Sequence, residues 1–293
     1  MAMPALCVTG MHGLGDNLHQ RGVVRALAKR YQVWLDTPWP SLYHDMHDVR
    51  LFSTGTRLRT QARNLIREQV QLGRPMRRFD HQISVASPPQ YIRQHRSVPR
   101  AMAAFCGVEL DDWRLPVPDS WSHGLDLPAD RPIMVYRPLT VRREWRGGVT
   151  RNPDADHYAS IYQRIRSRFY VVSVADIQPP HEVIDGPEQD ADLKLHNGQL
   201  GIRQLAALWK AADLVFTSPG MGLVMAQAVG TPYIATFGGY EMAYSFSAGE
   251  AYAKHLNIEP INPCDCCSHT HGCDKRIDIP AAYARLDAFM ETL

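Results

Sequence analysis

Short apolar runs alternate with segments of helical periodicity along the whole chain. The first run, residues 4–9, leads into a glycine-rich turn at 10–16 and then a segment at 18–31 whose apolar side chains recur at helical spacing. A second apolar run at 32–36 follows at once. Strand, turn, helix and strand in this order predict a βαβ unit with parallel strands.

The same alternation continues to the end of the chain. Further strands are expected at 49–53, 82–86, 133–136, 170–175, 214–217 and 233–237, and further helices at 60–72, 89–105, 155–169, 201–211, 222–229 and 281–290. We therefore predict an α/β protein with two Rossmann-like parallel-sheet domains. In such sheets ligands bind beyond the carboxyl ends of the strands, which would place a site in a cleft that the two domains face.

Prolines interrupt the helical pattern between residues 110 and 132. We expect an N-terminal domain at 1–120, a linker at 121–131, a C-terminal domain at 132–280 and a bracing helix at 281–293. The length of 293 residues fits two domains, because one domain averages roughly 150 residues.

Composition narrows the class of protein. Hydrophobic residues make up 45% and charged residues 21% of the chain, which is typical of a soluble globular protein and excludes disorder, collagen and coiled coil. No apolar run approaches the ~20 residues that cross a bilayer, and the first residues lack the pattern of an export signal. We expect a cytoplasmic protein without a transmembrane segment.

The net charge of +2 conceals an uneven distribution. Between residues 50 and 100 eleven arginines stand against only Glu68 and Asp80, which gives that stretch a charge of +9. Such a local excess predicts an anionic partner.

The glycine-rich turn offers the first candidates for chemistry. Gly13 and Gly15 let the backbone approach a ligand closely. Asp16 would repel a phosphate there, so it is a candidate general base for a substrate hydroxyl or amine. The alternative is that Asp16 only caps the helix, which is worth about 1 kcal/mol. His19 is a second catalytic candidate, against the alternative of a histidine in the core.

Two parts of the sequence resemble one known family. Residues 13–18, Gly-Leu-Gly-Asp-Asn-Leu, and the later stretches 205–215, 226–232 and 235–238 are similar to the heptosyltransferase-like glycosyltransferases, glycosyltransferase family nine, and they occur in the same order. The resemblance implies a GT-B fold whose second domain binds a nucleotide-diphosphate sugar and whose first domain binds the acceptor. It implies that Asp16 is the base, that inversion is the simpler outcome, and that no catalytic metal is obligatory.

The resemblance also places the donor diphosphate at the turn before the helix at 222–229. The chain departs from the family there, with Pro219-Gly220-Met221 and Val224 in place of an Asp-Thr-Gly turn and a His. The donor candidates are Ser218, Gly220, Met221 and Gly222, together with Arg137, Arg142 and Arg143, which follow the strand at 133–136. Those arginines could instead form a solvated loop.

Residues around the first turn and in the Arg-rich segment are the candidates for holding the acceptor. They are Gly13, Gly15, Gln20, Arg21, Arg57, Arg59 and Arg63.

Thiols and imidazoles are concentrated near the carboxyl end. The cluster consists of Cys264, Cys266, Cys267, His269, His271 and Cys273. In a cytoplasmic chain this density predicts a tetrahedral, structural zinc site, in which adjacent Cys266 and Cys267 would not both be ligands. The alternative is a loop that orders the chain before its last helix.

Three functions remain open at this stage. The first is transfer of a sugar from a nucleotide-diphosphate donor to a polyanionic acceptor such as the phosphorylated core of lipopolysaccharide. The second is a phage-type transferase that hypermodifies a modified pyrimidine in DNA. The third is a non-catalytic protein that binds a nucleotide or a polyanion.

Overall fold

The computed structural model describes residues 3–68, 72–76, 78–142, 151–264 and 274–293. The chain divides into two compact units, each with its own parallel sheet. Unit 1 comprises Met1–Pro116, Gly201–Arg203 and Tyr244–Ala248, and unit 2 comprises Val117–Leu200, Gln204–Ala243 and Gly249–Leu293. The linker expected at 121–131 lies within unit 2.

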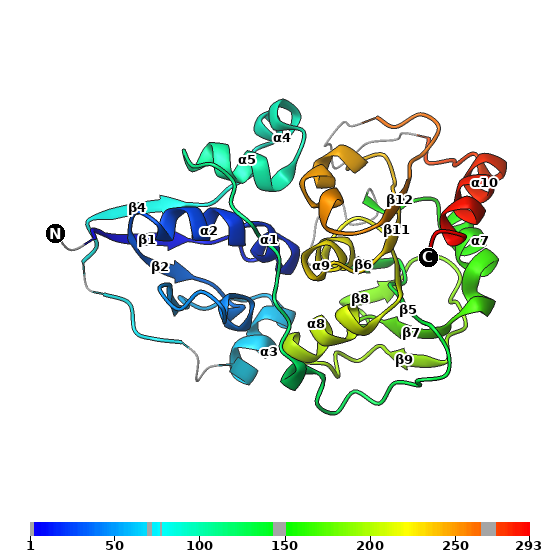
Figure 1. Ribbon diagram of the computed structural model, residues 1–293, viewed down its shortest axis with the longest axis horizontal. Helices are drawn as coiled ribbons and strands as arrows, with labels where there is room; N and C mark the ends of the chain where they lie inside the picture. The colour runs from blue at the N-terminus through cyan, green and yellow to red at the C-terminus, as the bar shows by residue number, and fades with distance from the viewer. Residues whose placement is uncertain (1–2, 69–71, 77, 143–150, 265–273) are drawn as a thin grey trace. The chain divides into compact units, whose positions relative to one another are not determined.

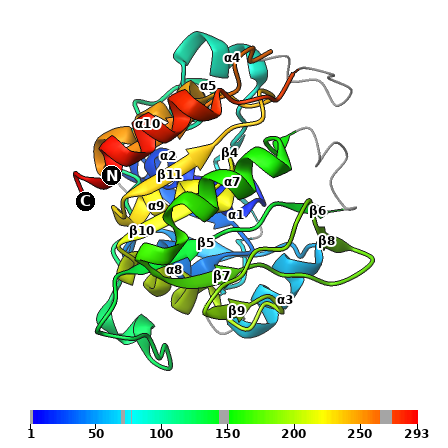
Figure 2. The same cartoon turned by 90° about the vertical axis from the view of Figure 1, so that its right-hand side faces the viewer.

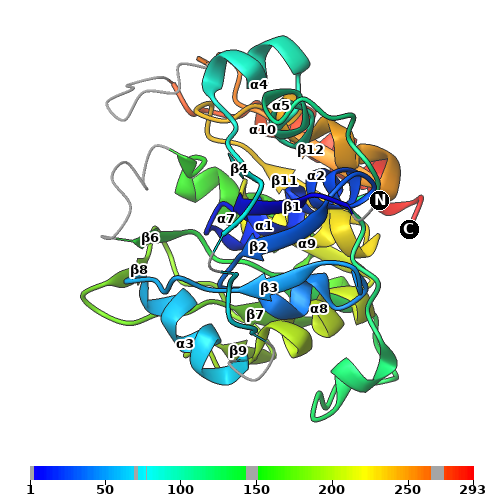
Figure 3. The same ribbon diagram turned by 90° about the vertical axis from the view of Figure 1, so that its left-hand side faces the viewer.

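Sheet A of unit 1 has four parallel strands in the order β3-β2-β1-β4 (Figures 1 and 3). The strands are β1 (Ala5–Thr9), β2 (Gln32–Asp36), β3 (Arg50–Phe52) and β4 (His81–Ser84). Val8, Val33 and Leu35 in the two central strands are completely buried. Valine and leucine suit these positions, because a buried strand favours apolar side chains and valine also favours the strand conformation.

Helices and a 3-10 turn surround this sheet in the described part of residues 1–116. They are α1 (Leu14–His19), α2 (Arg21–Ala28), α3 (Arg59–Glu68), α4 (Pro89–His95), α5 (Val98–Phe105) and η1 (Pro40–Tyr43). Helix α2 packs against β2 and α5. Its Val23 and Val24 are completely buried, as the helical spacing of apolar residues predicts.

Sheet B of unit 2 has six parallel strands in the order β12-β11-β10-β5-β7-β9. They are β5 (Ile133–Tyr136), β7 (Tyr170–Val174), β9 (Leu193–Leu195), β10 (Leu214–Thr217), β11 (Tyr233–Thr236) and β12 (His255–Ile258). Every residue of β5, β10 and β11 is buried, so these strands read as continuous apolar runs in the sequence. A separate antiparallel pair joins β6 (Thr140–Arg142) to β8 (Glu182–Ile184).

Helices cover both faces of sheet B. Helices α7 (Ala155–Ile165) and α10 (Ile279–Met290) pack together on one face, and α8 (Ile202–Ala211) and α9 (Met221–Val229) lie on the other (Figures 1 and 2). Short 3-10 segments occur at η3 (Asp119–Ser122), η4 (Arg166–Arg168) and η5 (Ala243–Tyr252). Asp154 and Asp278 cap α7 and α10 by accepting hydrogen bonds from His157 N and Ala281 N.

The structure corrects two of the expected helices. The helix expected at 89–105 is two helices, because Arg96 between them has a φ of 50°. The helix expected at 18–31 starts earlier, at Leu14, and Gln20 separates it into α1 and α2. Strands β6, β8, β9 and β12 were not expected at all. Within the described part of the chain, none of the helices is both long enough and apolar enough to span a bilayer.

Candidate functional site

The glycine turn follows β1 at the carboxyl edge of sheet A. Gly13 is the N-cap of α1, so Asp16 lies in the first helical turn and not at the cap position considered above. The Asp16 carboxylate lies over Gly13, where an added Cβ would overlap its Oδ2 atom. A Cβ at residue 13 would therefore require this carboxylate, which is half-buried, to move.

Side chains from α1 and its C-cap fix the backbone of the turn. Asn17 Nδ2 donates hydrogen bonds to the carbonyl oxygens of Met11 and Gly13, the latter at 2.8 Å. Gln20 Oε1 accepts from Met11 N, also at 2.8 Å. Asn17 and Gln20 are completely buried, so water does not compete for these bonds.

A second pair of side chains reaches the turn from outside α1. Trp39 Nε1 and Gln61 Nε2 both donate to the carbonyl oxygen of His12, each at 2.8 Å. The turn before Asp16 is therefore held both by side chains of α1 and its C-cap and by side chains from outside α1.

Two of the residues expected to hold the acceptor lie in the interior. Gln20 Nε2 donates to the hydroxyl of Tyr43 at 2.7 Å. Arg21 is completely buried and forms an ion pair with Asp45 at 2.9 Å. Burial lowers the pKa of Arg21, whereas the Asp45 carboxylate opposes that shift. Because Gln20 and Arg21 are enclosed and bonded within unit 1, we assign them to its framework and not to a binding surface.

His19 also lies in the interior of unit 1. Its side chain is 2% exposed, and its ring meets Trp113 edge-on with centroids 5.0 Å apart. Phe246 lies on another side, at 6.1 Å between centroids. Nε2 of His19 has no hydrogen-bond partner, and burial lowers the pKa of the imidazole to about 3. A neutral ring without access to solvent is poorly placed for proton transfer, so we leave His19 out of the proposed chemistry.

The arginines expected to hold the acceptor lie on α3 or just before it. Arg57 is exposed, and Arg59 and Arg63 are partly exposed. The two acidic residues of the same segment both accept hydrogen bonds from backbone amides of unit 1. Glu68 is 6% exposed and accepts from Ser41 N, and Asp80 accepts from Ala5 N. Glu68 is therefore withdrawn from the surface, whereas Asp80 is exposed and offsets one of the eleven positive charges there.

The donor turn links β10 to α9 in unit 2. Gly220, the N-cap, has a φ of 129° and a ψ of −151°, a conformation open to glycine alone. A Cβ on Gly222 would lie 2.5 Å from Thr217 Oγ1 and 2.9 Å from Arg137 Cγ. Ser218 and Met221 complete the turn and are partly exposed. These glycines bring the start of α9 close to the end of β10.

The structure describes Arg137 and Arg142, two of the three arginines expected to bind the donor. Arg137 follows β5, and its Nη1 donates to the carbonyl oxygen of Val174 at 2.6 Å. Burial lowers the pKa of Arg137, whereas the nearby Glu182 carboxylate opposes that shift. Arg142 pairs with buried Glu182 at 2.8 Å across β6 and β8, so it belongs to that pair of strands. Arg143 lies outside the described residues.

Arg151, which the sequence did not single out, also lies beside the donor turn. Nη2 of Arg151 lies 3.9 Å from the position that a Cβ on Gly220 would take. The same nitrogen is 2.8 Å from Glu241 Oε2. No spacing in the sequence distinguishes Arg151 from the other arginines, because only the fold brings it to α9.

The zinc prediction falls mostly outside the described residues. Cys264 is described, and its thiol donates to the carbonyl oxygen of Gly239 at 3.2 Å. The remaining candidates, Cys266, Cys267, His269, His271 and Cys273, lie in the segment 265–273, which is not described. The described residues contain no group of three or more metal-ligating side chains. The zinc site stays a prediction.

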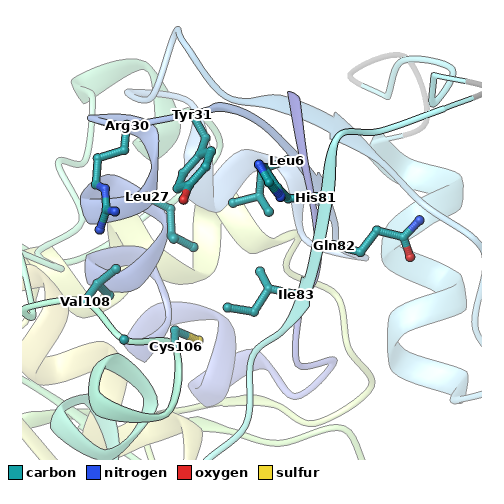
Figure 4. A pocket seen from close by; sticks show the side chains of 10 residues that line it. Leu6, Leu27, Arg30, Tyr31, His81, Gln82, Ile83, Cys106 and Val108 are labelled. Atoms are coloured by element: carbon teal, nitrogen blue, oxygen red, sulfur yellow. The ribbon is translucent and has the colours of Figure 1, made fainter. Parts of the chain in front are cut away.

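Unit 1 contains a cavity of about 270 Å³ (Figure 4), and no residue of the glycine turn at 10–16 lines it. It opens between β4, the end of α2 and the residues that follow α5. It is lined by Leu6, Leu27, Arg30, Tyr31, His81, Gln82, Ile83, Cys106, Gly107 and Val108. None of the candidate site residues is among them, so we do not place the candidate site there.

No protein-family model matches the chain, and no curated protein matches it in sequence. Solved structures do. Heptosyltransferase II of lipopolysaccharide synthesis from E. coli is similar, with a TM-score of 0.57, 15% identity, and coverage of 98% of this chain and 99% of that one.

Two further structures are similar. One is the family 9 glycosyl transferase from Veillonella parvula, with a TM-score of 0.56, 13% identity, and coverage of 87% and 86% of the two chains. The other is the iron-containing dodecameric glycosyltransferase TibC from enterotoxigenic E. coli, with a TM-score of 0.63, 10% identity, and coverage of 99% of this chain and 76% of that one. The α/β fold of GT-B type that the sequence predicts is therefore confirmed, and it is the fold of the heptosyltransferase-like glycosyltransferases.

Proposed function

We propose that the protein is a glycosyltransferase that moves a sugar from a nucleotide-diphosphate donor to a polyanionic acceptor, with Asp16 as general base. The observation that carries the proposal is the position of the Asp16 carboxylate over Gly13, on a turn held by buried hydrogen bonds. The fold supports it, because structures of this fold include the E. coli heptosyltransferase WaaC with ADP and TibC with ADP-heptose.

The reaction is a single displacement. An Asp16 carboxylate oxygen takes the proton of an acceptor hydroxyl while that hydroxyl oxygen bonds to the anomeric carbon of the sugar. The bond from the anomeric carbon to the diphosphate oxygen breaks, and the nucleoside diphosphate leaves with the electron pair. Attack on the face opposite the leaving group inverts the anomeric centre.

The leaving diphosphate is assigned to unit 2. Helix α9 begins at Met221 directly after Gly220, so its first amides present partial positive charge to an anion. The stem of Arg137 packs beside Gly222, and Arg151 lies beside Gly220. Helix amides and guanidinium groups stabilise charge on a departing diphosphate.

The acceptor is assigned to unit 1 on the basis of charge. Arg57, Arg59 and Arg63 lie in the stretch between residues 50 and 100, where eleven arginines stand against two carboxylates, of which Glu68 is buried. The salt dependence of binding separates the two polyanions considered above. If the acceptor is duplex DNA, the log of the affinity falls with the log of the salt concentration by about 0.9 for each phosphate contacted. If no binding to duplex DNA is detected at low salt, the acceptor is not DNA, and phosphorylated core oligosaccharide is the next probe.

Substitution of Asp16 tests the proposed function. We expect Asp16→Asn to lower turnover by ~100-fold or more, because general bases contribute about 10²–10⁴-fold to rates. ADP-heptose and UDP-, GDP- and ADP-linked hexoses serve as donor probes, first in a thermal-shift screen and then in assays of nucleoside diphosphate release. The matched control is Asp48→Asn, an exposed carboxylate of unit 1.

The outcomes separate the open functions. A transferase keeps donor binding and loses turnover in Asp16→Asn, whereas Asp48→Asn behaves as the wild type. Full turnover in Asp16→Asn would contradict the assignment of Asp16 as the general base. A protein that is stabilised by nucleotides but releases no diphosphate with either acceptor is a binding protein without catalysis.

A further inference from the structure

Helix α3 presents polar residues to the interior. Gln61, Asn64 and Glu68 are 2%, 5% and 6% exposed, whereas Ile66 is 72% exposed. The three polar residues share one face, because residues three, four and seven apart align along a helix. An ordinary surface helix would bury the isoleucine and expose the polar side chains. The contacts that the polar face makes explain this reversed pattern.

Each buried polar side chain of α3 holds a backbone segment. Asn64 Nδ2 donates to the carbonyl oxygen of Pro38 at 2.7 Å, and Glu68 accepts from Ser41 N at 3.2 Å. These two contacts fix the segment that follows β2. A buried polar group costs free energy unless it is hydrogen-bonded, so the bonds account for these residue types.

Gln61 contacts a different segment, the turn that leads to Asp16. Its Nε2 donates to His12 O at 2.8 Å, and its Oε1 accepts from Thr56 Oγ1 at 2.7 Å. Both ends of the amide are therefore bonded, which fixes its orientation. Gln61 therefore links α3, which carries Arg59 and Arg63, to the glycine turn.

We propose that Gln61 is a positioning residue that aligns the Asp16 carboxylate by holding the His12 carbonyl against α3. This inference rests on the proposed function. Arg59 and Arg63 lie on the same helix, so an acceptor held by them is held by the element that also fixes the turn. Displacement of a catalytic group by about 1 Å can lower a rate by about 100-fold.

The test compares two substitutions of similar shape on the same helix. Gln61→Met removes the bonds to His12 O and Thr56 Oγ1. Asn64→Leu removes the bonds to Pro38 O and Glu68 and no direct bond to the turn. We expect Gln61→Met to lower kcat by about ten- to a hundredfold with donor KM within about twofold, and Asn64→Leu to leave kcat within about twofold. Thermal unfolding checks that the two variants lose similar stability.

A double variant distinguishes positioning from loss of structure. If Gln61 acts through Asp16, Gln61→Met lowers turnover little further in the Asp16→Asn background. Equal kcat in Gln61→Met and Asn64→Leu, or the same fold loss from Gln61→Met in both backgrounds, would overturn the inference and leave the proposed function intact. Full turnover in Asp16→Asn would instead overturn the proposed function.

Hydrogen exchange gives an answer that does not depend on a substrate. We expect amides of residues 10–16 to exchange faster in Gln61→Met than in Asn64→Leu, and equal exchange would contradict the inference. If Gln61→Met does not fold, Gln61→Glu replaces it, because it keeps an acceptor for Thr56 Oγ1 and removes the donor to His12 O. The same outcomes then apply.

Discussion

The Asp16 carboxylate lies directly over Gly13, at a position where a Cβ on residue 13 would overlap Oδ2. The position of the carboxylate therefore depends on residue 13, although Gly13 has no side chain. Gly13 itself has an ordinary extended backbone, with a φ of −62° and a ψ of 144°. Steric room for the carboxylate is therefore the requirement that favours glycine here, and backbone conformation is not.

Gly13→Ala displaces the Asp16 carboxylate, because the added methyl group takes the space of Oδ2. We expect kcat to fall by about ten- to a hundredfold, with donor affinity unchanged. Steady-state kinetics and nucleotide titration measure the two effects. Gly73→Ala is the matched control, since a Cβ there meets its nearest atom, Leu51 O, at an ordinary 3.4 Å. A wild-type kcat in Gly13→Ala would mean that the position of the carboxylate does not limit the rate.

Gly222→Ala is expected to destabilise unit 2 and weaken donor binding. The methyl group would lie 2.5 Å from Thr217 Oγ1 and 2.9 Å from Arg137 Cγ, so one of them must move. Such overpacking costs about 1–3 kcal/mol, which urea unfolding measures. Movement of Arg137 should also weaken binding of ADP in calorimetric titration. Gly201→Ala is the control, because nothing lies within 4 Å of its added Cβ, and equal effects of the two substitutions would contradict the close packing.

Acid should destabilise the protein through His19. Burial lowers the pKa of His19 to about 3 from an ordinary 6.5, so between these values the unfolded chain binds more protons than the folded one. The contribution of His19 is fully present above pH 6.5 and is lost as the pH falls, with a slope of up to about 1.4 kcal/mol per pH unit.

Urea unfolding at several pH values between 7 and 4.5 measures this slope. We expect His19→Phe, which keeps a ring against Trp113, to show a shallower loss of stability than the wild type. His81→Gln, at an exposed histidine of the same unit, should follow the wild type. Parallel pH profiles for wild type and His19→Phe would show that His19 is not the group responsible.

Strands and helices could be predicted largely from local pattern. The fully buried strands β5, β10 and β11 are continuous apolar runs, and α7 and α9 begin close to where the spacing of apolar residues places them. The single helix expected at 89–105 was wrong because Arg96 has a positive φ, which its residue type does not indicate. Strands β8 and β9, of three residues each, carry too few side chains for a periodic signal.

The sequence by itself determined the α/β class, the two glycine turns and Asp16 as the candidate base, because glycines and alternating apolar runs report local backbone and burial. Only the tertiary structure decided which polar residues are enclosed. Gln61 bonds to His12 from 49 residues away, and His19 and Arg21 are buried by Trp113 and Asp45 from distant segments. Burial of a polar side chain depends on hydrogen-bonding partners from distant parts of the chain, and a local sequence pattern does not identify these partners.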